Sequence, residues 1–115
     1  MSVNQEKDRV TVQALLEVFE RKTSDSLGYL ANYSPGGLMI IGKKQISPGT
    51  EFECKMSVPD NILSNREMFF SLKTVWCEED IVPGDYTIGF QFEHIDKEDF
   101  RLLVSISENL LTQSS

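Results

Sequence analysis

The chain has 115 residues, of which 40% are hydrophobic and 25% are charged, and this size and composition predict one globular domain rather than a multi-domain enzyme. Its 18 acidic residues against 11 lysines and arginines give a net charge of −7, which would repel a polyanion, so nucleic-acid binding is not expected. No apolar run approaches the roughly 18 to 20 residues of a membrane span. Residues 1–12 are charged where a signal peptide would be apolar, so we expect a cytoplasmic protein.

The first part of the chain predicts an arm followed by two strands. Residues 1–9 are polar and have no periodicity, which is typical of a flexible N-terminal arm, and residues 10–115 then form the domain. Between Val10 and Val18 the apolar residues occupy alternate positions, as in a strand with one buried face. Residues 22–26 predict a turn, and the alternation resumes from Leu27 to Tyr33.

The next segment predicts a tight bend between two strands. Pro35, Gly36 and Gly37 separate an apolar run over residues 27–31 from a second run over residues 38–41. Because residues 38–41 are all apolar, we expect that strand to be covered on both sides. The bend would expose backbone N–H groups, and Asn32 and Ser34 add side-chain donors beside them, so the segment is a candidate anion site of the nest type.

The second half of the chain predicts three more strands and a helix. Apolar and polar residues alternate cleanly from Glu51 to Val58, and a long strand is expected from Arg66 to Cys77. Residues 78–85 form a hairpin loop, with Pro83-Gly84 at the centre of a type II turn, and residues 86–92 alternate again. Asp96 is a candidate N-cap for an amphipathic helix over residues 97–111.

This order of elements predicts a mainly β fold. Five or six strands followed by one helix favour a closed antiparallel barrel, or a strongly curled sheet, with the C-terminal helix laid against it. Closure would remove the two exposed edges that a flat sheet would leave.

The remaining candidate residues do not assemble a catalytic or metal site. Cys54 and Cys77 lack metal-ligand spacing and are expected to be free thiols. His94 is alone and is expected on the surface at a strand end, and residues 78–80 are expected in a solvated loop. No nucleophile, base and orienting group can be combined, so we expect neither an enzyme nor a bound cofactor. Three aromatic side chains on the last two strands are expected in the core, namely Trp76, Phe90 and Phe92.

Three groups of residues, in their order and spacing, resemble the PilZ family, whose members are small bacterial β-barrels. They are the Asn32, Ser34, Gly37 motif; Val75-Trp76 followed by Gly89-Phe90-Gln91-Phe92; and Ile95-Asp96-Lys97-Glu98-Asp99-Phe100 at the start of the helix. The resemblance covers about residues 9–111. It implies a six-stranded antiparallel β-barrel with a C-terminal α-helix and, as in many members, binding of the second messenger cyclic di-GMP.

The other family signature, Arg-x-x-x-Arg on the arm before the first strand, is only half present. Arg9 matches the second arginine, but the first position holds Gln5. The resemblance therefore implies that Arg9, Asn32, Ser34 and Gly37 bind the ligand. Because one charge-assisted arginine contact contributes roughly 1.5 to 3 kcal/mol, we expect Gln5 to weaken binding by about 10 to 100-fold.

Two functions follow from the resemblance. The first is a cyclic di-GMP receptor whose arm folds over the ligand and so creates or hides a docking surface for a protein partner that remains to be identified. The alternative, motivated by Gln5, is a nucleotide-independent adaptor of the PilZ type for pilus, flagellar or secretion machinery.

Overall fold

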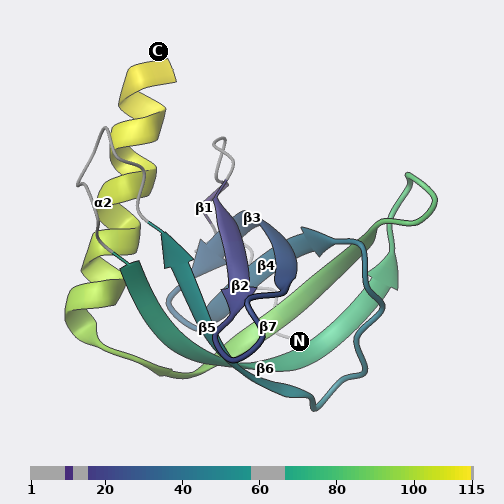
Figure 1. The fold of residues 1–115 in the computed structure, drawn as a ribbon. Helices are drawn as coiled ribbons and strands as arrows, with labels where there is room; N and C mark the ends of the chain where they lie inside the picture. The colour runs from purple at the N-terminus through teal and green to yellow at the C-terminus, as the bar shows by residue number, and fades with distance from the viewer. Residues whose placement is uncertain (1–9, 12–15, 58–66, 115) are drawn as a thin grey trace.

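The structure is a computed structural model, which describes residues 10–11, 16–57 and 67–114, with side chains described over residues 16–57 and 67–106. Over the described residues, seven strands precede one helix (Figure 1). The elements are β1 (Val10–Thr11), β2 (Glu17–Glu20), β3 (Ser26–Ser34), β4 (Gly37–Gly42), β5 (Glu51–Ser57), β6 (Glu67–Glu79), β7 (Tyr86–Ile95) and α2 (Lys97–Ser114).

Six of the strands close into a barrel. The pairing order is β1-β3-β2-β5-β6-β7-β4, every pair is antiparallel, and β4 also pairs with β3, which completes the ring from β2 to β7. The predicted six-stranded antiparallel β-barrel with a C-terminal helix is therefore confirmed. Within the ring each strand has a hydrogen-bonded neighbour on both sides, so closure removes the exposed edges that a flat sheet would have.

The single strand predicted from Val10 to Val18 is described as two strands, β1 and β2. Both pair with β3 but at different points along it: Val10 lies opposite Tyr33, and Glu17 lies opposite Tyr29. The predicted apolar positions 12 and 14 fall outside the described residues. The first strand segment thus meets β3 close to the motif residues Asn32 and Ser34.

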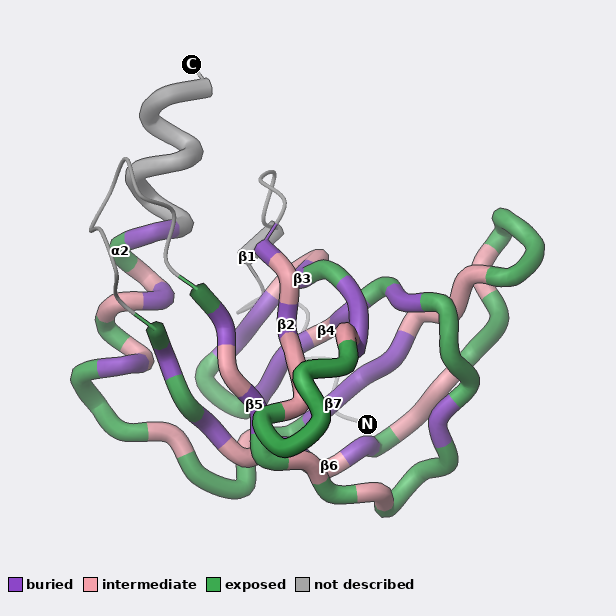
Figure 2. Tube along the Cα trace, in the orientation of Figure 1, coloured by how far each residue is buried: buried purple, intermediate pink, exposed green. Residues whose placement is uncertain are grey.

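Buried residues alternate with more exposed ones along much of the barrel strands (Figure 2), and the buried apolar side chains form the core. On β5, Cys54 and Met56 are buried whereas Glu51 and Glu53 are exposed, as the alternation predicts. On β7, Ile88 and Phe90 are buried and Phe92 packs against the core from its edge. The alternation of apolar and polar residues in the sequence therefore corresponds to the alternation of inward and outward side chains in the barrel wall.

β4 departs from its prediction. Leu38 and Ile40 are buried, but Met39 is half-buried and Ile41 is exposed, so the strand is covered on one side and not on two. The reason is that β4 lies in the wall of a closed barrel, between β3 and β7, where only one face of the strand points inward. Its continuous apolar run leaves two apolar side chains on the outer wall.

The predicted turn at the end of the β6–β7 hairpin is confirmed. Gly84 has a φ of 90°, and the N–H of Asp85 donates to the carbonyl oxygen of Val82 at 3.1 Å. Pro83 and Gly84 therefore occupy the two central positions of a type II turn, where Pro fixes one φ and Gly accepts the positive one. β6 continues to Glu79, so the loop itself is shorter than predicted and spans residues 80–85.

The C-terminal helix begins where the sequence predicts. α2 starts directly after Asp96, whose carbonyl oxygen accepts from the N–H of Phe100 at 2.9 Å, and it continues beyond the predicted end at residue 111. The ring of Phe100 meets Tyr33 and Phe92 edge-on, with centroids 6.2 and 6.1 Å apart. These contacts attach the start of the helix to the ends of β3 and β7.

His94 lies at the end of β7 and is exposed, as predicted, and its Nε2 atom is 3.1 Å from Oδ1 of Asp96. Within the described part of the chain, no helix is long and apolar enough to span a bilayer.

Candidate functional site

The bend that carries the Asn32, Ser34, Gly37 motif is a two-residue hairpin turn. β3 extends to Ser34 and β4 starts at Gly37, so only Pro35 and Gly36 form the turn. Asn32 pairs with Met39 and Ser34 pairs with Gly37. The predicted bend is therefore present but shorter than predicted, because strand pairing continues up to Ser34 and resumes at Gly37.

The backbone angles give no support to the predicted anion nest of backbone N–H groups, which stays a prediction. One type of nest alternates right-handed and left-handed residues, and among the described residues positive φ angles occur only at positions 24, 28, 49 and 84. The N–H of Phe92 instead donates to the carbonyl oxygen of Gly36 at 2.9 Å. The side chains of the motif are therefore the groups that the structure places for a ligand.

Asn32 belongs to a row of side chains that crosses the outer wall of the barrel. A bulge between Leu30 and Asn32 changes the alternation, so that Leu30 and Tyr33 are buried while the Asn32 amide lies 3.6 Å from Sδ of Met39. Met39 in turn pairs with Gly89, and Gly89 pairs with Trp76. We call these four residues, Asn32, Met39, Gly89 and Trp76, the Asn32 row.

A second row, the Ser34 row, lies beside the first. Ser34 pairs with Gly37, Gly37 with Gln91, and Gln91 with Lys73. Each row crosses β3, β4, β7 and β6, a width of about 14 Å at the usual strand spacing. Ser34 is only 3% exposed whereas Asn32 is half-buried, so a ligand has readier access to the amide than to the hydroxyl.

Gly37 is required by the packing of the wall. A Cβ atom at this position would lie 1.9 Å from the carbonyl oxygen of Phe90, which belongs to the neighbouring strand β7. Because the obstacle is backbone, a side chain at residue 37 would force β4 and β7 apart. This requirement holds whether or not a ligand binds, so the glycine alone does not indicate function.

Trp76 and Lys73 are members of these rows that the sequence analysis did not assign to a ligand site. Trp76 was expected in the core, but its ring is half-buried and covers Gly89, where a Cβ atom would come within 2.3 Å of the indole. The physical reason is a bulge between Thr74 and Trp76 that interrupts the alternation of β6. Gly89 was the available signal, because a glycine inside a strand often marks a close approach of another group.

Arg9 lies outside the described residues. The residue that follows it, Val10, pairs with Tyr33, so β1 meets β3 between the two motif residues Asn32 and Ser34. The assignment of Arg9 to a ligand therefore stays a prediction, and the weakening expected from Gln5 does too.

The cysteines are separate from both rows. Burial raises the pKa of the Cys54 thiol from 9.0 to about 12, with a smaller contribution from the carboxylates of Glu20 and Glu53. Such a thiol stays protonated and is a poor nucleophile. Over the described residues, no group of three or more His, Cys, Asp or Glu side chains is arranged to hold a metal ion.

A pocket of about 520 Å³ lies at the other end of β3 and β4, and none of the predicted site residues lines it. The two rows bring an aromatic ring, an amide and an ammonium group to one face of the wall. Such a surface suits a flat ligand that carries negative charge, because the ring offers stacking and the polar groups offer hydrogen bonds.

The comparisons with known proteins agree with this fold. The family model described as PilZ domain matches residues 4–109 of the chain. No curated protein sequence matches it.

Several solved structures share the fold at low sequence identity. MotI/DgrA, the inhibitor of motility from Bacillus subtilis, superposes with a TM-score of 0.71 at 15% identity, over 93% of this chain and 50% of its own. MrkH from K. pneumonia in its apo state gives 0.67 at 16%, over 92% and 50%. The PilZ domain of YcgR from Escherichia coli, solved with cyclic di-GMP, gives 0.63 at 14%, over 92% and 90%.

The chain thus spans about half the length of MotI and MrkH, and nearly the whole of the YcgR domain. At these identities the superpositions establish the fold alone. The family model, which covers most of the chain, goes further: this chain belongs to the PilZ domain family.

Proposed function

We propose that this chain is a cytoplasmic receptor for cyclic di-GMP, which binds across the Asn32 and Ser34 rows on the outer wall of the barrel. The observation that carries the proposal is the gathering of Asn32, Ser34 and Gly37 with Trp76 and Lys73 on that wall, beside the strand that follows Arg9. Two structures of the same fold were solved with this ligand: the YcgR domain and the MrkH–c-di-GMP complex.

Each residue has a role that matches one part of the ligand. Cyclic di-GMP carries two phosphates and two guanines, so it needs cations, hydrogen-bond donors and a flat apolar partner. Arg9 pairs as a planar fork with a phosphate or with the O6/N7 edge of a guanine. Trp76 stacks on a base, and Lys73 supplies a point charge to a phosphate.

Affinity is set by the incomplete arginine pair. Gln5 can donate hydrogen bonds but brings no charge, and the net charge of −7 adds a weak long-range repulsion. Since screening limits that repulsion to about 8 Å at physiological ionic strength, the local contacts dominate. We therefore expect binding that is about 10 to 100-fold weaker than with two arginines.

Calorimetric titration of the folded protein with cyclic di-GMP tests this proposal. Binding should be measurable in the parent chain, lost or strongly reduced in Arg9→Ala, and about 10 to 100-fold tighter in Gln5→Arg. Gln45→Arg adds the same charge at an exposed position away from the two rows and should leave the affinity nearly unchanged. A folded sample that gives no heat with cyclic di-GMP would refute the receptor.

The second candidate, a nucleotide-independent adaptor for pilus, flagellar or secretion machinery, is favoured by one observation, the presence of Gln5 where the family signature has arginine. It predicts that Arg9→Ala with Ser34→Ala leaves a cellular motility phenotype unchanged. A change at an exposed helix position such as Arg101→Glu would instead abolish it. The receptor predicts that the first variant alters the phenotype.

A further inference from the structure

The loop between β6 and β7, residues 80–85, projects from the end of the barrel that lies away from α2 (Figure 1). It exposes two adjacent aliphatic side chains at its tip: Ile81 is 96% exposed and Val82 is 56% exposed. Hairpin tips usually carry polar residues or glycine. Aliphatic side chains placed at the far point of a projection bury their area only when another molecule covers them.

The tip is held in one conformation by its own backbone. The N–H of Asp80 donates to the carbonyl oxygen of Asp85 at 2.8 Å, and the N–H of Ile81 donates to Oδ1 of Asp80 at 2.8 Å. Pro83 and Gly84 complete the type II turn described above. A preorganised tip loses little conformational entropy when it docks, so its apolar area counts toward affinity.

Negative charge flanks the aliphatic pair. Glu78 and Glu79 are both exposed at the end of β6, directly before the tip. A partner surface that suits this loop therefore combines an apolar hollow with at least one cation at its rim.

The chain itself carries such a hollow. The pocket of about 520 Å³ has Tyr29 of β3 and Ile41 of β4 in its lining, and these side chains are 43% and 37% exposed. Lys43 and Lys44, which follow β4, also line the pocket, and we call them its lysine edge. The volume lies within the range of pockets that enclose small apolar groups, and the lysines provide the cationic rim.

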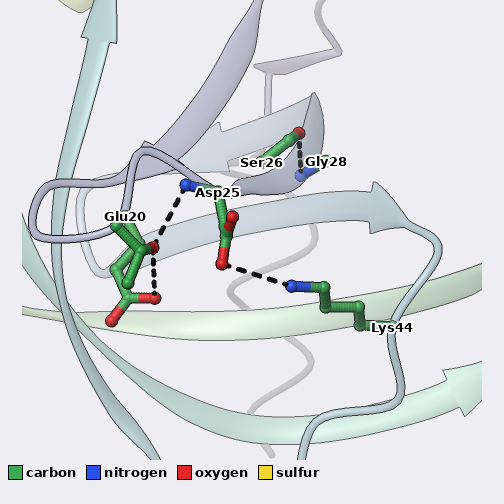
Figure 3. Close-up of polar contacts among 6 residues, drawn as sticks. Glu20, Asp25, Ser26, Gly28 and Lys44 are labelled. Atoms are coloured by element: carbon green, nitrogen blue, oxygen red, sulfur yellow. Dashed lines mark hydrogen bonds and ion pairs between the residues drawn. The ribbon is translucent and has the colours of Figure 1, made fainter.

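Of the two lysines, Lys44 is the one open to a new partner. Lys43 forms an ion pair with Asp85. Lys44 reaches toward Asp25 (Figure 3), but the ammonium and carboxylate are 3.9 Å apart, and the two side chains are 61% and 58% exposed. A pair this long and this exposed contributes little, so the ammonium can turn to a second carboxylate at small cost.

We propose that the Ile81-Val82 tip of one copy of this chain docks in the Tyr29–Ile41 pocket of a second copy, with Glu79 facing Lys44. Asp85 ends the loop and also lines the pocket, so tip and pocket lie at the same end of the barrel. Two copies related by a twofold axis exchange tips reciprocally, and the contact closes at a dimer. Glu17 lines the pocket as well, so the acidic tip is oriented toward the lysine edge.

Analytical ultracentrifugation of the whole chain, from micromolar to millimolar concentration, tests the apolar part of this contact. The parent protein should show a monomer–dimer equilibrium that Ile81→Ser with Val82→Ser weakens by about tenfold or more, because two aliphatic side chains no longer become buried. Val75→Ser removes a comparable exposed aliphatic group from the barrel wall and should leave the equilibrium unchanged. A parent protein that stays monomeric throughout would overturn the proposal.

A charge exchange tests the orientation. Lys44→Glu and Glu79→Lys should each raise the dimer dissociation constant by about tenfold, since each variant places like charges at both contacts. Mixing the two variants should restore a dimer, because residue 44 of each copy again meets an opposite charge at residue 79 of the other. Lys97→Glu, at the start of α2, makes the same charge change elsewhere and should have no effect.

Circular dichroism of every variant shows whether it is folded, and the measurements need no cyclic di-GMP, so their outcome is independent of the proposed receptor function. An unchanged dimer dissociation constant in both charge-reversed variants would rule out this mode of docking. Two variants that fail to associate when mixed would do so too.

Discussion

The indole of Trp76 covers Gly89 on the outer wall, and this one contact connects the stability of the barrel with the proposed ligand surface. In Gly89→Ala the new methyl group would lie 2.3 Å from Nε1 and Cε2 of the indole, so the ring has to move. We expect a loss of about 1 to 3 kcal/mol in the free energy of unfolding, as for other overpacked positions. Trp76 is the only tryptophan, so its fluorescence during urea unfolding reports the free energy of unfolding. Its emission in the folded state reports whether the indole ring has moved.

Gly49→Ala is the matched control for this change. A Cβ atom there has nothing within 4 Å, although the φ of 91° makes the substitution mildly strained. It should cost only about 1 kcal/mol and leave the emission of the folded state unchanged. If Gly89→Ala matched the parent in stability and emission, the indole would not be fixed on the glycine.

Cys54 predicts a loss of stability at alkaline pH. Its folded-state pKa is about 12 against an ordinary value of 9.0, mainly because the thiol is buried. The folded state therefore keeps a proton that the unfolded chain releases above pH 9. The contribution of this thiol is complete below pH 9 and falls by about 1.4 kcal/mol per pH unit as the pH rises toward 12.

Cys54→Ala should remove that part of the pH dependence, while a lower stability at neutral pH reflects the lost side chain. Chemical unfolding at pH 8, 9 and 10 measures the slope for each variant. Cys77→Ala retains Cys54 and should follow the parent. Parallel slopes for parent and Cys54→Ala would show that the buried thiol does not contribute.

Among the elements, the β3–β4 hairpin shows what a pattern of residues predicts and what it does not. Pro35 and Gly36 were predicted in the bend and do form it, because their backbone preferences act within a few residues. The exact ends of the two strands were missed, because pairing up to Ser34 depends on the register between β3 and β4. It also depends on the pairing of β4 with β7, which is distant in the sequence. The outward position of Met39 and Ile41 was missed for the same reason, since an apolar run does not say which face of a wall it occupies.

The hairpin also predicts an effect of Gly37→Ala that differs from that of a surface glycine. The added methyl would meet the backbone of Phe90 at 1.9 Å, so β4 and β7 have to separate at their point of pairing. We expect at least about 2 to 3 kcal/mol of destabilisation, and amide hydrogen exchange should accelerate first in β4 and β7. Gly84→Ala is the control, because a Cβ atom in that exposed turn meets nothing within 4 Å. It introduces backbone strain from the positive φ but no steric clash. Equal losses for the two variants would contradict the close approach.

At the scale of the whole molecule, the alternation of apolar residues predicted a closed barrel or a strongly curled sheet, and helical spacing predicted the C-terminal helix. The resemblance to the PilZ family was needed to choose the six-stranded barrel. A strand of period two has one buried face, and a series of such strands closes when each needs a neighbour on both edges. The two rows were not predictable in this way. They join Asn32 to Trp76 and Ser34 to Lys73 across four strands, and their registers depend on two bulges that no local pattern marks.

The closed ring also predicts how the N-terminal arm can be separated from the fold. The strands that close the barrel lie within residues 17–95, so none of these pairings uses residues 1–9. Deleting residues 1–9 should therefore change the melting temperature by about 4 °C or less, equivalent to under about 1 kcal/mol, because the core is intact. Binding of cyclic di-GMP should be lost, since the deletion removes Arg9.

Thermal unfolding and calorimetry on the same sample measure both quantities, and full-length Arg9→Ala is the control that removes the guanidinium alone. A truncated chain that unfolds would mean that the arm is part of the domain, and one that still binds the nucleotide would mean that the ligand contacts come from the barrel wall without Arg9.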